Sequence, residues 1–270
     1  MEFIFRGKRI YYESHGNGAP LLILNGIFMS AASWVAFVPA FSRNNRLLLL
    51  DMLDQGRSDK MAEEYTQELQ ADLVLAFLEH LQLEKATLCG ISYGGEVAMQ
   101  VAVRWPERVE KLILSNTCAY TSPWLRDIGK SWEYAFRSYD GHQFFKTCIP
   151  IIYSPRFYEE NYAWASARED LFVRVFDRPV YDAFARLTRS AETHDVRDGL
   201  PRISAKTLVI SSEFDFITPP YMQTELARAI PNAAQVTVPN AGHALMYEKP
   251  AEFAALVLGF ANADTDIKIL

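Results

Sequence analysis

The sequence has few cysteines, no excess of basic residues and no long apolar run. Its 270 residues include only Cys89, Cys118 and Cys148, whose spacing matches no zinc site and which cannot all pair with one another. We therefore expect buried thiols in a reducing compartment and no disulfide framework. The net charge of −6 does not supply the clustered lysine and arginine that bind phosphate backbones, which argues against nucleic acid as a partner.

Signals for membranes and cofactors are also missing. No stretch approaches the roughly 20 apolar residues that span a bilayer, and the first residues have no signal-peptide pattern. We therefore expect a cytoplasmic protein with no membrane span. No HExxH, GxGxxG or GxxxxGK[ST] motif occurs, so we expect no metal and no nucleotide cofactor. The expected partner is a small molecule, and a homodimer is compatible with the sequence.

Short apolar runs alternate with helical patterns along most of the chain. Such runs are typical of parallel strands covered on both faces, and they occupy residues 20–26, 46–51, 86–90, 111–116 and 206–212. Apolar residues at helical spacing predict helices over 33–41, 68–81, 95–104 and 221–230. Alternating residues predict a hairpin over 3–13 and another strand over 234–238. The chain is therefore predicted to form an α/β fold with a mostly parallel, eight-stranded sheet flanked by helices.

The strand pattern stops between residues 119 and 200. This part has helix-like segments rich in aromatic residues, which makes a disordered loop a poor alternative. We expect residues 1–118 and 201–270 to form one core domain, with 119–200 inserted as a helical lid above the strand ends. Most lid aromatics should pack in a core and a minority should contact substrate; they are Trp124, Trp132, Tyr134, Phe136, Phe144, Phe145, Tyr158, Tyr162, Trp164 and Phe172.

One serine stands where an apolar strand turns into a helix. In the stretch LCGISYGGEVAMQVAVRWP, the residues Gly90, Ser92 and Gly94 form the pattern GxSxG. A sharp strand-to-helix turn strains the backbone of its bend residue and leaves room only for glycine beside it. The pattern favours an exposed, reactive Ser92 over a serine that only caps a helix.

A serine hydroxyl becomes a good nucleophile only when a base accepts its proton and an acid orients that base. Of five histidines, His243 lies in a loop after a predicted strand, at the same edge of the sheet as Ser92. Asp215 follows another predicted strand and is the expected acid, with Glu213 as the alternative. Serine, aspartate and histidine then occur in the chain order of one known catalytic triad.

The sequence resembles the α/β-hydrolase superfamily over nearly its whole length. Besides GISYGG, four segments carry this resemblance: ILNGIFMSAASW, DMLDQGRSD, EFDFITP and PNAGHALMYEKP. The resemblance implies that the backbone amides of Ile27 and Tyr93 form an oxyanion hole. Phe28 and Met29, beside that loop, are expected to line the substrate pocket.

Two segments depart from the family pattern. Asn25 stands where many members have histidine, which should change the hydrogen bonds of the loop but leave its backbone donors in place. Leu53 and Asp54 replace a proline and a glycine, and this change has no functional interpretation from sequence. The pair Asn25-Gly26 and the stretch SAASW resemble a subset that includes bacterial lipid-type esterases and hydroxyacyl-ester synthases.

The resemblance implies a serine hydrolase with Ser92, His243 and Asp215 as its triad. Such an enzyme would cleave an ester or thioester with an apolar acyl group through an acyl-enzyme, without a cofactor. One alternative is an acyltransferase that passes a hydroxyacyl group to a hydroxyl acceptor, and another is a hydrolase of carbon–carbon bonds. A ligand receptor that merely keeps the fold is the least favoured alternative.

Overall fold

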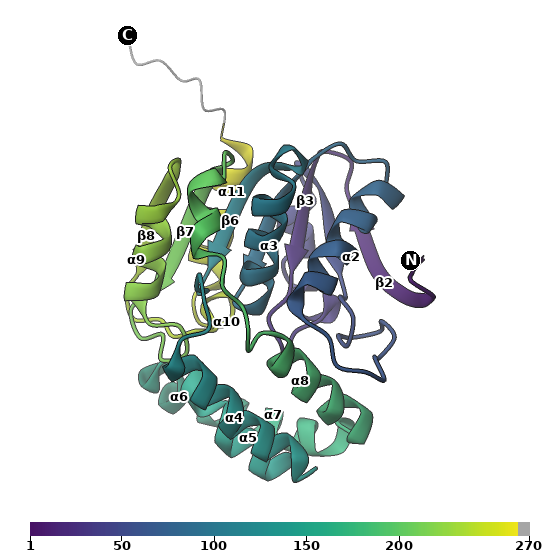
Figure 1. Cartoon of the computed structure of the whole chain (residues 1–270). Coiled ribbons are helices and arrows are strands. Elements are labelled where there is room, and N and C mark those ends of the chain that lie inside the picture. Colours follow the sequence, from purple (N-terminus) through teal and green to yellow (C-terminus); the bar gives the residue numbers. More distant parts are fainter. Residues whose placement is uncertain (264–270) are drawn as a thin grey trace.

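The computed structural model describes residues 1–263 and has a central sheet with helices on both faces (Figure 1). The strand order is β1-β2-β4-β3-β5-β6-β7-β8. The first two pairings are antiparallel and all later ones are parallel, which confirms the predicted mostly parallel sheet. The strands are β1 Glu2–Phe5, β2 Lys8–His15, β3 Ala19–Leu24, β4 Asn45–Leu50, β5 Ala86–Ile91, β6 Val109–Ser115, β7 Lys206–Ser212 and β8 Ala233–Val238.

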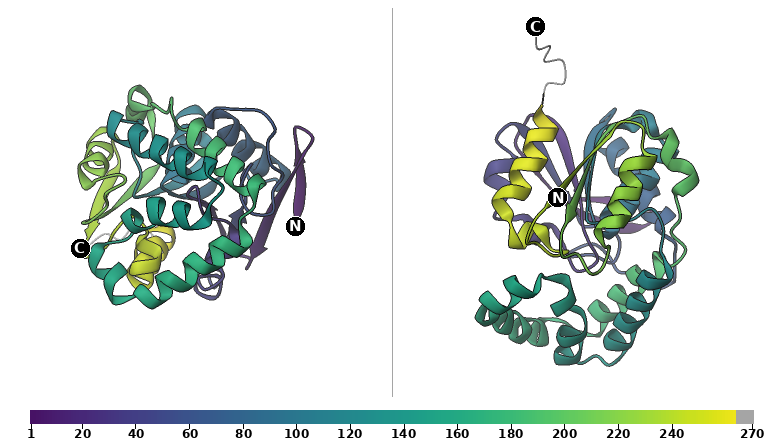
Figure 2. Two further views of the ribbon diagram at one scale, coloured as in Figure 1. Left: turned by 90° about the horizontal axis from the view of Figure 1, so that it is seen from below. Right: turned by 90° about the vertical axis from the view of Figure 1, so that its left-hand side faces the viewer.

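Helices cover the sheet from both sides. Helices α2, α3 and α9 lie on one face and α11 lies on the other (Figures 1 and 2), where α1 contacts α11. Every residue of β5 is buried, which explains why that strand reads as a continuous apolar run. The helices are α1 Val38–Phe41, α2 Gln67–His80, α3 Tyr93–Arg104, α4 Pro123–Arg137, α5 Gly141–Cys148, α6 Pro155–Glu160, α7 Tyr162–Val175, α8 Arg178–Ser190, α9 Pro220–Ala229, α10 Leu245–Glu248 and α11 Pro250–Asn262.

The prediction of one helix over 33–41 is wrong. This stretch instead contains a 3-10 turn, Ala31–Trp34, followed by the single-turn helix α1. Pro39 explains the break, because its ring would clash with the carbonyl four residues earlier in a continuous helix, whereas the first turn of α1 accommodates it. Trp34 and Phe41 still reach the core, where both pack near Phe253.

Helices α4 to α8 come between β6 and β7 in the chain and lie at one end of the sheet (Figures 1 and 2). Phe28, in the loop after β3, joins them to the core by packing against aromatic rings of this helical segment, namely Trp132, Phe136, Phe144 and Phe184. The predicted second part of the core domain, 201–270, includes residues 264–270, which lie outside the described part of the chain. Within residues 1–263, no helix is long and apolar enough to cross a membrane.

The unusual Asp54 connects the core to the helical segment. Its backbone has φ 67°, and its buried carboxylate accepts hydrogen bonds from Nη2 and Nε of Arg186 in α8 at 2.7 and 3.1 Å. The amide of Met61 donates to the same carboxylate at 3.0 Å. A second contact joins the Tyr93 hydroxyl to the Ser190 hydroxyl at 2.8 Å. The loop after β4 is therefore tied to α8 by a two-pronged ion pair.

Arg186→Met should destabilise the protein by about 3 kcal/mol, because it leaves the Asp54 carboxylate buried without its cation. Chemical denaturation measures this change in the free energy of unfolding. The double variant Asp54→Asn with Arg186→Met should recover more than half of the loss, since asparagine tolerates the left-handed backbone at position 54. Arg156→Gln, which removes an exposed ion pair with Glu160, is the control and should cost less than about 0.5 kcal/mol. Equal losses from Arg186→Met and the control would contradict a buried, partnered carboxylate.

Candidate active site

Ser92 occupies a strained bend between β5 and α3. Its φ is 53°, in the left-handed region that a serine rarely adopts. Gly90 and Gly94 are needed because of close backbone contacts. A Cβ on Gly90 would lie 2.4 Å from the carbonyl oxygen of Gly94, and one on Gly94 would lie 2.1 Å from that of Leu24. The tight packing of β5, α3 and β3 therefore holds the serine in this conformation.

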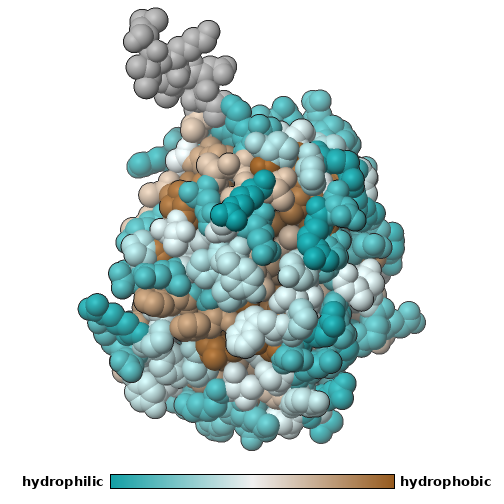
Figure 3. Space-filling view, turned by 60° about the vertical axis from the view of Figure 1, so that its left-hand side comes forward, coloured by the Kyte–Doolittle hydropathy of each residue, from teal (hydrophilic) through white to brown (hydrophobic). Residues whose placement is uncertain are grey.

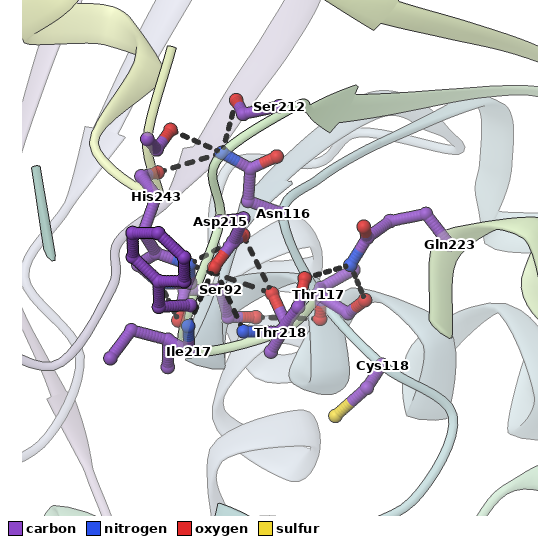
Figure 4. Close-up of polar contacts among 12 residues, drawn as sticks. Ser92, Asn116, Thr117, Cys118, Ser212, Asp215, Ile217, Thr218, Gln223 and His243 are labelled. Carbon is purple, nitrogen blue, oxygen red and sulfur yellow. Dashed lines mark hydrogen bonds and ion pairs between the residues drawn. The ribbon is translucent and has the colours of Figure 1, made fainter. Parts of the chain in front are cut away.

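Three side chains from three loops meet at this bend (Figure 4). His243, in the loop between β8 and α10, places Nε2 2.9 Å from the Ser92 hydroxyl oxygen. Its Nδ1 lies 2.8 Å from Oδ2 of Asp215, in the loop after β7. The arrangement assigns the Nδ1 proton to the bond with Asp215, which leaves Nε2 free to accept the serine proton. The structure thus brings together all three residues of the predicted triad.

Three hydrogen bonds hold the Asp215 carboxylate in one orientation. Its Oδ1 accepts hydrogen bonds from the amides of Ile217 and Thr218, both at 2.9 Å. The Thr218 hydroxyl donates to Oδ2 at 2.9 Å, and the carboxylate is fully buried. The alternative acid, Glu213, is exposed and accepts a bond from the Asn240 amide instead.

The other histidines lie away from this site. His15 and His142 contact Glu13 and Glu169, respectively. His80 stacks on Phe3, and the buried His194 contacts the Cys118 carbonyl. No group of three histidine, cysteine, aspartate or glutamate side chains that could hold a metal ion occurs in residues 1–263.

Two polar residues that the sequence analysis missed support the histidine loop. Asn116, which has φ 48°, donates to the His243 carbonyl at 2.7 Å and to the Ser212 hydroxyl at 2.9 Å (Figure 4). Glu248 accepts bonds from the Gly242 amide at 3.0 Å and the Ser154 hydroxyl at 2.6 Å. Asn116 could have been found from its position, because an asparagine directly after an apolar strand is a polar group at the end of that strand. Nothing local marks Glu248, because its partners come from distant segments.

The expected oxyanion donors lie beside the serine. The ideal Cβ position of Gly26 is 3.7 Å from Cβ of Ser92, so the loop carrying Ile27 runs alongside the nucleophile. Ile27 and Tyr93 both line a cavity with Ser92. Within the described residues, neither backbone amide donates a hydrogen bond to the protein. Both donors are therefore available to a bound oxygen atom.

Asn25 has a structural role in the same loop. Its side-chain oxygen accepts a 2.7 Å bond from the Trp34 indole, and its amide donates to the Leu50 carbonyl at 2.9 Å. Gln55 donates to the Gly26 carbonyl at 3.0 Å. The asparagine that replaces the usual histidine therefore binds the loop to the SAASW stretch and to the end of β4.

Two cavities meet at Ser92, and both also contact Ile27 and Trp132. The larger cavity, of about 110 Å³, is lined by His243, Phe28 and Met29 among mainly apolar side chains. The smaller cavity, of about 70 Å³, extends past Tyr93 and Glu96 towards α4 and α8. The face of the molecule in Figure 3 is mostly hydrophilic with separate apolar patches.

A buried carboxyl group lies one helical turn beyond the nucleophile. Glu96 accepts bonds from Gln67 at 2.5 Å and from the Cys118 thiol at 3.6 Å, with no cation beside it. Burial raises the pKa of Glu96 to about 7 and also raises the pKa of Cys118. Gln100 connects Gln67 to His194, whose pKa burial lowers to about 4. These groups favour their neutral forms inside the protein.

Glu96→Gln should stabilise the protein at high pH. The wild-type carboxyl titrates near 4.5 when unfolded and near 7 when folded, so its burial costs stability increasingly as the pH rises between these values. Thermal unfolding should show the variant more stable than wild type at pH 8, by up to about 3 kcal/mol, with a difference below about 0.5 kcal/mol at pH 4.5. The exposed Glu63→Gln is the control and should show no such pH dependence. A difference of the same size at both pH values would contradict the raised pKa.

Comparisons with known proteins place the chain in a family. A model of the alpha/beta hydrolase fold matches residues 19–250. The crystal structure of MGS-M2, an alpha/beta hydrolase enzyme from a Medee basin deep-sea metagenome library, is 45% identical and covers 100% of both chains with a TM-score of 0.97. A putative carbamate hydrolase, RutD of Azorhizobium caulinodans, is 27% identical over 94% of this chain and 95% of its own.

A further relative is the 2-hydroxymuconate semialdehyde hydrolase of Pseudomonas sp. strain CF600. It is 27% identical and covers 97% of this chain and 94% of its own. All three relatives are named as hydrolases, two of them for different substrates. The family model, the eight-stranded sheet and the serine at its bend agree: the chain belongs to the α/β hydrolase family.

Proposed function

We propose that the protein is a serine hydrolase that cleaves a carboxylic ester or thioester with Ser92, His243 and Asp215. The main support for this proposal is a pair of hydrogen bonds that link the three side chains. Asp215 and His243 are 2.8 Å apart, and His243 and Ser92 are 2.9 Å apart. A hydroxyl beside a base that is itself oriented by a buried carboxylate is the arrangement that activates serine. The free amides of Ile27 and Tyr93 add support, because acyl transfer generates an oxyanion.

The first half-reaction forms an acyl-enzyme. His243 Nε2 accepts the hydroxyl proton as Ser92 Oγ attacks the substrate carbonyl carbon, and the new oxyanion accepts bonds from the Ile27 and Tyr93 amides. His243 then donates that proton to the leaving group as its bond to the carbonyl carbon breaks. Asp215 remains ionised and stabilises the imidazolium form of His243.

The second half-reaction releases the acid. A water molecule attacks the acyl carbonyl while His243 accepts one of its protons. Collapse of the second oxyanion breaks the bond to Ser92 Oγ, which regains its proton from His243. A hydroxyl acceptor in place of water would give acyl transfer by the same steps.

Hydrolysis of a carbon–carbon bond is a second candidate. The relative named 2-hydroxymuconate semialdehyde hydrolase favours it, because it matches this chain over almost its whole length. The same serine and histidine would serve that reaction, with a carbon leaving group receiving the proton.

Ser92→Ala should abolish covalent labelling by a fluorophosphonate probe and lower kcat for ester hydrolysis by about 10⁴-fold or more, because the nucleophile is removed. Mass spectrometry of the labelled protein identifies the modified residue. Ser131→Ala, at an exposed position of α4, is the control and should be labelled like wild type. Undiminished labelling of Ser92→Ala would exclude this serine as the nucleophile.

A substrate panel separates the proposed chemistry from its alternatives. Nitrophenyl esters and acyl thioesters of increasing chain length should be turned over, with free acid as the product because water is the acceptor. The panel includes 2-hydroxymuconate semialdehyde as the carbon–carbon substrate and a short alcohol as a competing acceptor. Turnover of the semialdehyde alone would favour carbon–carbon hydrolysis, and ester products in place of free acid would favour acyl transfer.

A further inference from the structure

The larger cavity beside Ser92 contains one permanent cation among apolar side chains. Arg168, from α7, lines this cavity together with Ser92 and His243. The remaining wall is mainly aliphatic and aromatic, with contributions from Ile27, Phe28, Met29, Ile152, Phe172 and Tyr247. Arg168 is half-buried, and an anionic partner would compensate its guanidinium for the water that it has lost.

Arg168 has aromatic contacts but no anionic partner. Its guanidinium carbon lies 4.5 Å from the ring centre of Trp164 and 5.4 Å from that of Tyr247. Within residues 1–263 it forms no ion pair, and its Nε is buried without a hydrogen-bond partner. The adjacent Glu169 instead contacts His142 and Lys146. The ring faces attract the cation but cannot accept bonds along the whole edge of the guanidinium plane.

Comparison with Arg186 shows what is missing. Arg186 lies in the same helical segment and is neutralised by the two oxygen atoms of Asp54. A guanidinium edge matches a carboxylate in this two-pronged way. Arg168 presents the same chemistry to a cavity instead of to a protein carboxylate. A carboxylate on a bound small molecule would give Arg168 the anionic partner that it lacks.

The position of His243 indicates which half of the substrate should carry the carboxylate. His243 lines the larger cavity and is not part of the lining of the smaller one. Because His243 returns its proton to the leaving atom, the leaving group should depart into the cavity that His243 faces. The acyl group then extends past Tyr93 into the smaller cavity.

We propose that Arg168 binds a carboxylate on the leaving-group half of the substrate, so that the natural substrates are esters of carboxylate-bearing alcohols or phenols. This inference rests on the proposed serine hydrolase function. It makes Arg168 a specificity-determining residue, because the ion pair forms at a distance from the bond that breaks. Neutral esters would still meet the same nucleophile.

The test compares 3-acetoxybenzoate with phenyl acetate, which carry the same acyl group on leaving groups that differ by one carboxylate. Wild type should have the higher kcat/KM for 3-acetoxybenzoate. Arg168→Gln should lower that value by about 100-fold, chiefly through KM, and change phenyl acetate hydrolysis by less than about 3-fold. Arg168→Lys should retain part of the preference. Arg174→Gln, at an exposed position on the same helix, is the control and should leave both values unchanged.

Binding of the product 3-hydroxybenzoate gives a readout that does not need turnover. Calorimetry should show binding to wild type and to Arg174→Gln, and a loss of about 100-fold in affinity for Arg168→Gln. Equal binding to wild type and Arg168→Gln would overturn the inference, as would equal effects on the two acetates. A preference for a carboxylate on the acyl side, tested with mono-4-nitrophenyl glutarate against 4-nitrophenyl butyrate, would also overturn it. Failure to hydrolyse either acetate would instead count against the proposed function, while the binding measurement still decides the role of Arg168.

Discussion

The close packing of backbone around Ser92 is the constraint on which the rest of the structure depends. Strand β5 turns into α3 within one residue, and the bend is possible only because Gly90 and Gly94 let the chain approach α3 and β3. Hydrogen bonds from the Ser92 amide to the Ser115 carbonyl and from the Thr117 hydroxyl to the Ser92 carbonyl add support from β6 and the segment after it. A residue with φ 53° is held by its surroundings, and strain of this kind is typical of functional sites.

Parallel strands bring the other polar groups to that bend. The loops after β5, β7 and β8 leave the sheet at one edge, so residues as far apart as Ser92 and His243 lie within hydrogen-bonding distance. Buried polar residues then fix the loops, since Asn116 holds the His243 carbonyl and Thr218 holds the Asp215 carboxylate. A buried polar group without such partners would be costly, so this network favours a single arrangement of the site.

Three charged or titratable groups have different surroundings and therefore different consequences. Asp54 meets Arg186 and joins the core to α8. Glu96 has only neutral partners, so burial raises its pKa to about 7. Arg168 faces the larger cavity with aromatic contacts alone, and its missing anion is the basis for the substrate class inferred above. Whether a buried ionic group serves stability, titration or recognition depends on what lies opposite it.

The sequence alone determined the fold class, because apolar runs and helical periodicity reflect local burial on each face of a strand or helix. The bend at Ser92 could also be predicted from the local sequence, because glycines in this pattern indicate close backbone contacts. Tertiary structure decided the rest. The ion pair of Asp54, the support from Glu248 and the unpartnered Arg168 all depend on which distant segments meet. Such contacts leave no periodic signal in one sequence, because each is made once, between residues whose separation along the chain is arbitrary.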